Sequence, residues 1–128
     1  MNKHEVINTL LGVGISFEDA IALRRISMTL HRWHELECGT GDGHIERDET
    51  TGRPIYYNAR ARYVDPHDPR AYHGIPDREA GALKRLGCIM ARYPTMQAYV
   101  QGDPRGAALF IGEGLTDSNY SNGVAVYK

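Results

Sequence analysis

The sequence contains few cysteines, few large aromatic side chains other than tyrosine, and no hydrophobic run of membrane-spanning length. Its two cysteines, Cys38 and Cys88, exclude the secreted scaffolds that several disulfides hold together, and a reducing compartment fits this composition. Residues 1–5 lack the charged and apolar regions of a signal peptide. We therefore expect a cytoplasmic protein with no membrane partner.

Neither sign of charge dominates, because 15 basic and 16 acidic side chains give a formal net charge of −1. With this balance, the net charge of the protein creates no overall electrostatic attraction to nucleic acid. The distribution is uneven, however: residues 60–92 carry seven basic and four acidic side chains, whereas residues 41–59 carry two and four. Arginine supplies 12 of the 15 basic residues, and its planar guanidinium suits phosphate or carboxylate. The alternative explanation for the high arginine content is a GC-rich genome, which favours arginine codons throughout.

The hydrophobic pattern predicts a single domain over residues 1–128 with an α+β fold. Apolar residues at helical spacing, with capping residues before them, favour helices at 2–12, 16–38 and 76–93. Short apolar or alternating runs favour strands at 44–47, 54–64, 96–101, 107–111 and 123–127. Because helices and strands segregate along the chain, we expect an antiparallel sheet of about five short strands with three helices mainly on one face.

The second predicted helix provides much of the expected core. Leu23, Ile26, Leu30 and Trp33 recur along one stripe of this helix, and such a stripe faces the interior of a globular protein. Cys38 and Cys88 fall in predicted helices and are interpreted as small buried residues.

The strand predicted at residues 54–64 is the first candidate binding surface. Side chains alternate between the faces of a strand, so one face presents a phenol, an amide and two guanidiniums: Tyr56, Asn58, Arg60 and Arg62. The other face, from Tyr57 to Tyr63, suits packing under a helix. Stacking combined with arginine is how many proteins hold bases and phosphates. The alternative is a solvated strand face without a ligand.

The loop at residues 101–106 is the second candidate contact. Asp-Pro opens a tight turn, and the two flanking glycines leave the backbone accessible. The turn therefore presents the carboxylate of Asp103 and the guanidinium of Arg105 at the edge of a sheet. Tyr99 in the preceding strand and Tyr120 before the last strand are added as aromatic candidates. The alternative is a plain hairpin connection.

Potential metal ligands recur on one side of the second helix. Four residues share about 100° of its surface and have side chains that ligate zinc: His31, His34, Glu35 and Cys38. Their spacing matches no strong zinc signature, so we predict no metal and no cofactor and keep His31, His34 and Cys38 only as candidates. Histidines and aspartates at residues 65–73 could carry protons. Because no nucleophile or phosphate-loop motif accompanies them, the sequence favours a protein that is not an enzyme.

Four stretches of the chain lie within residues 23–39, 76–83, 99–109 and 123–126, and the most specific is Asp-Pro-Arg-Gly-Ala-Ala-Leu at 103–109. Together they resemble a family of small accessory proteins of bacteriophages and prophages. The family has no agreed activity, so the resemblance implies no catalytic residue. It implies a protein of the bacterial cytoplasm that handles nucleic acid or blocks host defence. Residues 40–75, which hold the Tyr56 surface, resemble the family poorly.

The sequence therefore predicts a non-enzymatic accessory protein that recognises an anionic partner, either nucleic acid or a nucleotide, in a counter-defence role. One alternative is an inhibitor that binds a host defence enzyme, and a second is a small metal-dependent enzyme. The strand at 123–127 is a candidate sheet edge and hence a route to a homodimer.

Overall fold

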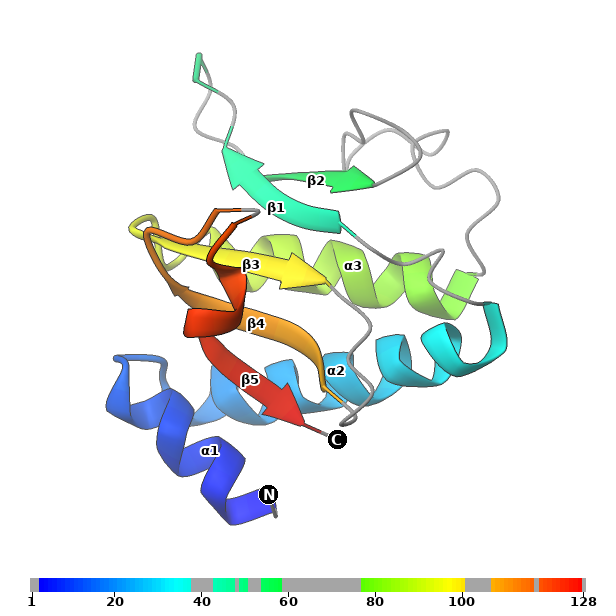
Figure 1. Cartoon of the computed structure of the whole chain (residues 1–128), viewed down its shortest axis with the longest axis horizontal. Helices are drawn as coiled ribbons and strands as arrows, with labels where there is room; N and C mark the ends of the chain where they lie inside the picture. The colour runs from blue at the N-terminus through cyan, green and yellow to red at the C-terminus, as the bar shows by residue number, and fades with distance from the viewer. Residues whose placement is uncertain are drawn as a thin grey trace.

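The computed structural model describes residues 3–37, 43–47, 49–50, 54–58, 77–100, 107–116 and 118–127, arranged as in Figure 1. The helices are α1 (Lys3–Gly12), α2 (Phe17–Glu37) and α3 (Asp77–Met90). The strands are β1 (Gly43–Arg47), β2 (Pro54–Asn58), β3 (Met96–Val100), β4 (Ala107–Glu113) and β5 (Val124–Tyr127), and the 3₁₀ helix η2 (Tyr120–Asn122) precedes β5. Within these elements, the side chains at 32–37, 43–47, 54–58, 77, 107–108 and 127 are outside the description.

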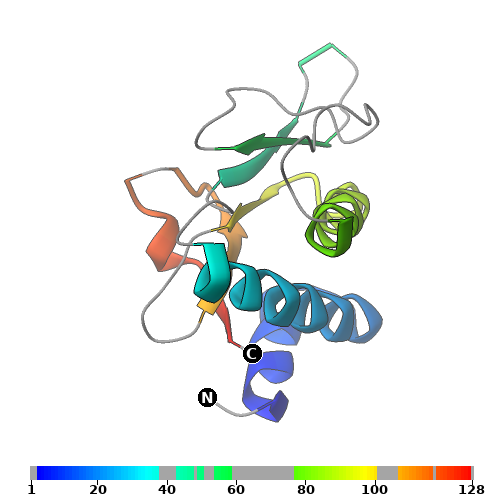
Figure 2. The same ribbon diagram turned by 90° about the vertical axis from the view of Figure 1, so that its right-hand side faces the viewer.

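The strands form an antiparallel sheet in the order β2-β1-β3-β4-β5. Helices α2 and α3 pack against each other behind the sheet, and α1 lies beside β5 (Figures 1 and 2). α3 contacts both β2 and β3, the strands that precede and follow it in the chain. These observations confirm the predicted α+β class with an antiparallel sheet.

The corner between α1 and α2 is built from glycine and serine. Gly14 has a φ of 94°, a left-handed conformation that glycine adopts at little cost. Ser16 then caps α2, because its Oγ accepts a hydrogen bond from the backbone N–H of Asp19 at 3.2 Å. Together these residues end one helix and start the next in a defined direction.

The main core lies between the helices and one face of the sheet. The predicted α2 stripe is confirmed at Leu23, Ile26 and Leu30, which are at most 1% exposed, while Trp33 lies outside the described side chains. The sheet contributes Ala98, Val100 and neighbouring apolar residues of β4 and β5 to the same cluster. Since full burial of one large aliphatic side chain stabilises a fold by about 1.5–3 kcal/mol, this cluster is the main source of stability.

The C-terminal end of α3 is held to the start of α2 by a buried carboxylate. Asp19 accepts hydrogen bonds from Arg92 Nε at 3.1 Å and from the Tyr93 hydroxyl at 2.6 Å. The Tyr93 oxygen also accepts the backbone N–H of Ser16 at 3.0 Å, so it links the two groups of the α2 cap. This cluster fixes the position of α3 relative to α2.

The strand at the C-terminal end of the sheet order is β5, which confirms the prediction of a sheet edge there. The buried hydroxyl of Ser27 on α2 donates a hydrogen bond to the carbonyl of Val126 in this strand. Helices α1 and α2 both contact β5. At Val126, therefore, the strand already has a hydrogen-bond partner within the same chain, and a homodimer formed by strand pairing has no support here.

Candidate functional site

The predicted surface on strand 54–64 is described only at its backbone, over β2. Tyr56 is in register with Ile45 of β1, and Ile45 with Ala98 of β3. Directly opposed positions in an antiparallel sheet share a face, and Ala98 belongs to the helix-side core. The position of Tyr56 is thus in line with that core, whereas we expected its neighbour Tyr57 to face the helices.

This difference has a simple physical reason. Alternation in a strand determines which residues share a face, but only the register with neighbouring strands determines which face is covered. Tyr57 is in register with His44, and His44 is in register with Tyr99. Tyr99 belongs to the cluster on the sheet face away from the helices, so the position of Tyr57 is in line with that face. The side chains of Tyr56 and Asn58, and both Arg60 and Arg62, lie outside the described residues.

Asp103 and Arg105 of the predicted turn also lie outside the described residues. The strands on either side are described: β3 and β4 pair in antiparallel fashion, with Val100 opposite Leu109. The segment between them therefore connects two neighbouring strands, as the sequence predicts. Its possible contact role stays a prediction.

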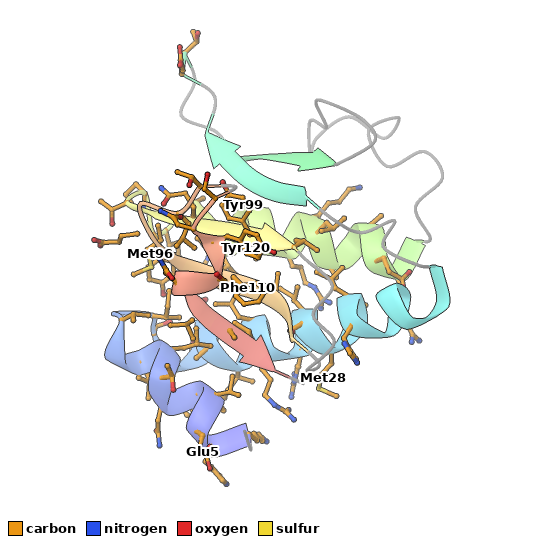
Figure 3. All side chains as sticks on the ribbon, in the orientation of Figure 1. Glu5, Met28, Met96, Tyr99, Phe110 and Tyr120 are labelled. Carbon is orange, nitrogen blue, oxygen red and sulfur yellow. The ribbon has the colours of Figure 1, made fainter. Side chains whose placement is uncertain are left out.

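Tyr99 and Tyr120 meet on the sheet face away from the helices, where Figure 3 shows them beside Phe110. The rings of Tyr99 and Tyr120 stack with centroids 5.7 Å apart, and Phe110 meets Tyr120 edge-on at 5.3 Å. Tyr99 is only 6% exposed, and its hydroxyl donates to the carbonyl of Leu115 at 3.5 Å. Because Tyr120 already occupies one face of the Tyr99 ring, Tyr99 serves packing rather than an open stacking platform.

The outer side of α3 presents a basic surface, which we define by the exposed side chains of Arg78, Lys84 and Arg85. The acidic Glu79 is only 8% exposed, so every exposed charged side chain between residues 78 and 90 is positive. Around the helix axis, Gly81 and the exposed Cys88 lie between the two arginines on one side and Lys84 on the other. The exposure of Cys88 contradicts our interpretation of it as a buried residue.

Helical periodicity explains this arrangement. Ala80, Leu83, Leu86 and Met90 are buried, as their spacing predicts. Seen down the helix axis, Cys88 and the basic residues lie on the opposite side. The sequence signals for the basic surface were therefore the excess of basic residues in 60–92 together with the helical stripe, although we had not assigned Arg78, Lys84 or Arg85 to a site.

Arg92 follows α3 and belongs to a different environment. It keeps 57% of its side chain exposed, but its guanidinium pairs with Asp19. The hydrogen bond from Arg92 is the largest cause that lowers the pKa of Asp19. Hydrogen bonds from Tyr93 and Ser16 lower this pKa further, whereas desolvation by burial opposes the shift. The carboxylate in turn raises the pKa of Arg92. The positive charge of Arg92 is thus compensated by the carboxylate of Asp19, and Arg92 is not counted in the basic surface of α3.

The candidate metal ligands are only partly described. His31 is half-buried on α2, whereas Cys38 and the side chain of His34 lie outside the described residues. Within the part of the chain that the structure describes, no three histidine, cysteine, aspartate or glutamate side chains come together in a way that could hold a metal ion. The same residues include no helix that is both long and apolar enough to cross a membrane.

Comparisons with protein-family models, with curated proteins and with solved structures find no match to this chain. The resemblance to bacteriophage accessory proteins therefore stays a prediction. Any function has to be inferred from the chemistry of the residues themselves.

Proposed function

We propose that this protein is a non-enzymatic binding protein that uses the basic surface of α3 to recognise a polyanion, with nucleic acid as the expected class. The observation that carries the proposal is the sign of the exposed charge: Arg78, Lys84 and Arg85 are exposed, and the acidic residue of the same stretch, Glu79, is buried. Lysine and arginine contacts to phosphate supply most of the affinity in sequence-independent nucleic-acid binding.

The spacing of the basic residues favours a polymer over a single nucleotide. Arg78 and Arg85 are seven positions apart, which is about 10 Å along a helix axis. Phosphates of one strand of a nucleic acid repeat about every 3.4 Å along the duplex axis, so this distance spans about three of them. Between the charged side chains lie Gly81 and Cys88, which are small enough for a backbone to approach the helix closely.

The candidate residues outside the description remain part of the proposal. Arg60 and Arg62 are expected to supply further guanidiniums, and Asp103 and Arg105 to form a second contact at the turn after β3. A role in bacteriophage counter-defence, in a bacterial cytoplasm, is part of the same proposal, and its support is the sequence resemblance alone.

The proposal is tested by reversing charge on α3 and comparing it with an equal reversal elsewhere. The variant Arg78→Glu/Arg85→Glu alters the proposed surface, and Lys3→Glu/Arg25→Glu makes the same change in net charge at exposed positions of α1 and α2. Binding of a labelled single-stranded oligonucleotide of mixed sequence is measured by fluorescence anisotropy over a range of salt concentrations.

We expect the α3 variant to bind at least about tenfold more weakly at low salt, with the slope of log K against log salt reduced by about 1.4 for two lost contacts to the phosphates of a single strand. The control variant should keep most of its affinity and its slope. Absence of wild-type binding at low salt, or equal losses in the two variants, would overturn the proposal.

A further inference from the structure

A half-open groove of about 530 Å³ lies at one end of the sheet, away from the basic surface of α3. Its walls come from the α1–α2 corner, the beginning of β3, the end of β4 and the beginning of β5. Val13, Met96, Ile111, Leu115 and Val124 make much of this lining apolar. In size it falls within the range of pockets that hold small ligands or single side chains.

Among the described residues that line the groove, Glu113 is the one with an ionisable side chain. It is exposed at the end of β4, and its Oε1 accepts a hydrogen bond from Thr95 Oγ1 at 3.1 Å. This bond positions the exposed carboxylate at the rim of the groove. The described lining therefore combines an apolar interior with the negative charge of Glu113.

The wall beside Glu113 is well ordered by side-chain to backbone hydrogen bonds. Asn119 Oδ1 accepts the backbone N–H of Thr116 at 2.6 Å, and its Nδ2 donates to the carbonyl of Gly114 at 3.3 Å. Gln97 Oε1 accepts the backbone N–H of Leu115 at 3.0 Å. These bonds connect the loop after β4 to β3 and to itself, and they support this wall of the groove.

Glycines keep the groove open. A Cβ atom at Gly123 would lie 2.8 Å from Leu115 Cδ1 and 2.9 Å from the carbonyl oxygen of Ile111, so no larger residue fits there. Gly114 has a φ of 66°, which most other residues avoid. At Gly12, in contrast, a Cβ atom would meet nothing within 4 Å.

Exposed apolar side chains stand at and near the α1–α2 corner that forms one wall of the groove. Val13 lines the groove and is 39% exposed, and its neighbours Leu11 and Phe17 are 39% and 57% exposed. Exposed apolar side chains close to the groove in the chain can contact a ligand that reaches beyond it.

We propose that the groove binds a basic segment of a partner protein, which places an apolar side chain inside and an adjacent lysine or arginine against Glu113. The charge of Glu113 selects a cation, the apolar lining selects an aliphatic or aromatic neighbour, and the exposed Leu11, Val13 and Phe17 contact the rest of the segment. This site is separate from α3 and opposite to it in charge.

The experiment uses ¹⁵N-labelled full-length protein and the capped dipeptide acetyl-Leu-Arg-amide as the probe. We expect the dipeptide to shift the amide signals of residues 112–115 and 122–124 of the protein. The expected Kd is about 1 mM, the weak affinity that one side chain and one exposed ion pair can supply. Acetyl-Leu-Gln-amide, which lacks the charge, and n-butylguanidinium, which lacks the peptide, should both bind several-fold more weakly.

Three variants assign the effect to the groove. Glu113→Gln keeps the shape and the acceptor for Thr95 but removes the charge, and it should weaken binding about fivefold. Gly12→Phe should fill the groove and abolish the shifts without strain, because its side chain enters open space. Glu5→Gln removes one negative charge at the far end of α1, which Figure 3 shows away from Met96, and should change nothing.

The proposal is overturned if the groove amides do not shift, if Glu113→Gln binds as well as the wild type, or if n-butylguanidinium binds as tightly as the dipeptide. The last result would identify a site for a small organic cation instead. Because the probes are cationic and α3 is basic, these outcomes are independent of the oligonucleotide measurement.

Discussion

The two faces of the sheet are packed in different ways. On the helix side, residues from α1, α2, α3 and three strands form one large buried cluster. On the other side, Tyr99, Phe110 and Leu115 form a small cluster that the partly exposed Tyr120 covers. The difference indicates that the helix side determines the stability of the fold, whereas the opposite side and the outer surfaces are where polar chemistry is accessible.

The largest expected effect is on the helix side. Leu86 is fully buried on α3, and Leu86→Ala removes three carbon atoms from the centre of the main cluster. We expect the free energy of unfolding to fall by about 3 kcal/mol, through lost burial and the cavity that remains. Urea unfolding followed by circular dichroism measures this loss. A change below about 1 kcal/mol would contradict the importance assigned to this cluster.

The Asp19 cluster should give an intermediate effect that depends on pH. Because the pKa of Asp19 is lowered in the folded state from its ordinary value of 3.8, its ionised form stabilises the fold above that pH, and this contribution is lost as the pH falls through the folded-state pKa. Asp19→Asn should cost about 1–3 kcal/mol near neutral pH, since the Arg92 contact loses its charge.

Unfolding of the wild type and of Asp19→Asn is compared from neutral pH to about pH 2. The gap between their free energies of unfolding should stay constant above pH 4 and narrow below about pH 4. Glu18→Gln, at the neighbouring exposed position, serves as the control and should show no such narrowing. A gap that is independent of pH would show that the Asp19 carboxylate does not supply the stabilisation.

The smallest effect is expected on the face away from the helices. Tyr120→Leu keeps an apolar side chain over Tyr99 but removes the stacked and edge-on ring contacts. We expect a loss of about 0.5–1.5 kcal/mol in the free energy of unfolding. A loss as large as that of Leu86→Ala would mean that the two faces contribute equally, and the comparison above would fail.

The sequence was sufficient for features that depend on local spacing. The cap at the start of α2 and the stripe from Leu23 to Leu30 follow from spacings that neighbouring residues alone determine. The exposure of Cys88 follows from the same helical period, but treating cysteine as a small apolar residue led to the wrong interpretation.

Features that depend on long-range contacts were beyond the sequence. The line through Tyr56, Ile45 and Ala98 is set by pairing between strands that α3 separates in the chain. The contact of Tyr120 with Tyr99 requires the loop after β4 to fold back over the sheet. The groove at Glu113 likewise joins a helix corner to three strand ends, and no single stretch of sequence encodes it.

The central claim is that the basic surface of α3 contacts nucleic acid, and amide chemical-shift mapping with an unlabelled single-stranded oligonucleotide at low salt tests it most directly. We predict that the largest shifts fall on residues 78–88 of the ¹⁵N-labelled protein and that α1 shows few. Shifts that spare α3, or no shifts in spite of a large excess of oligonucleotide, would contradict the claim.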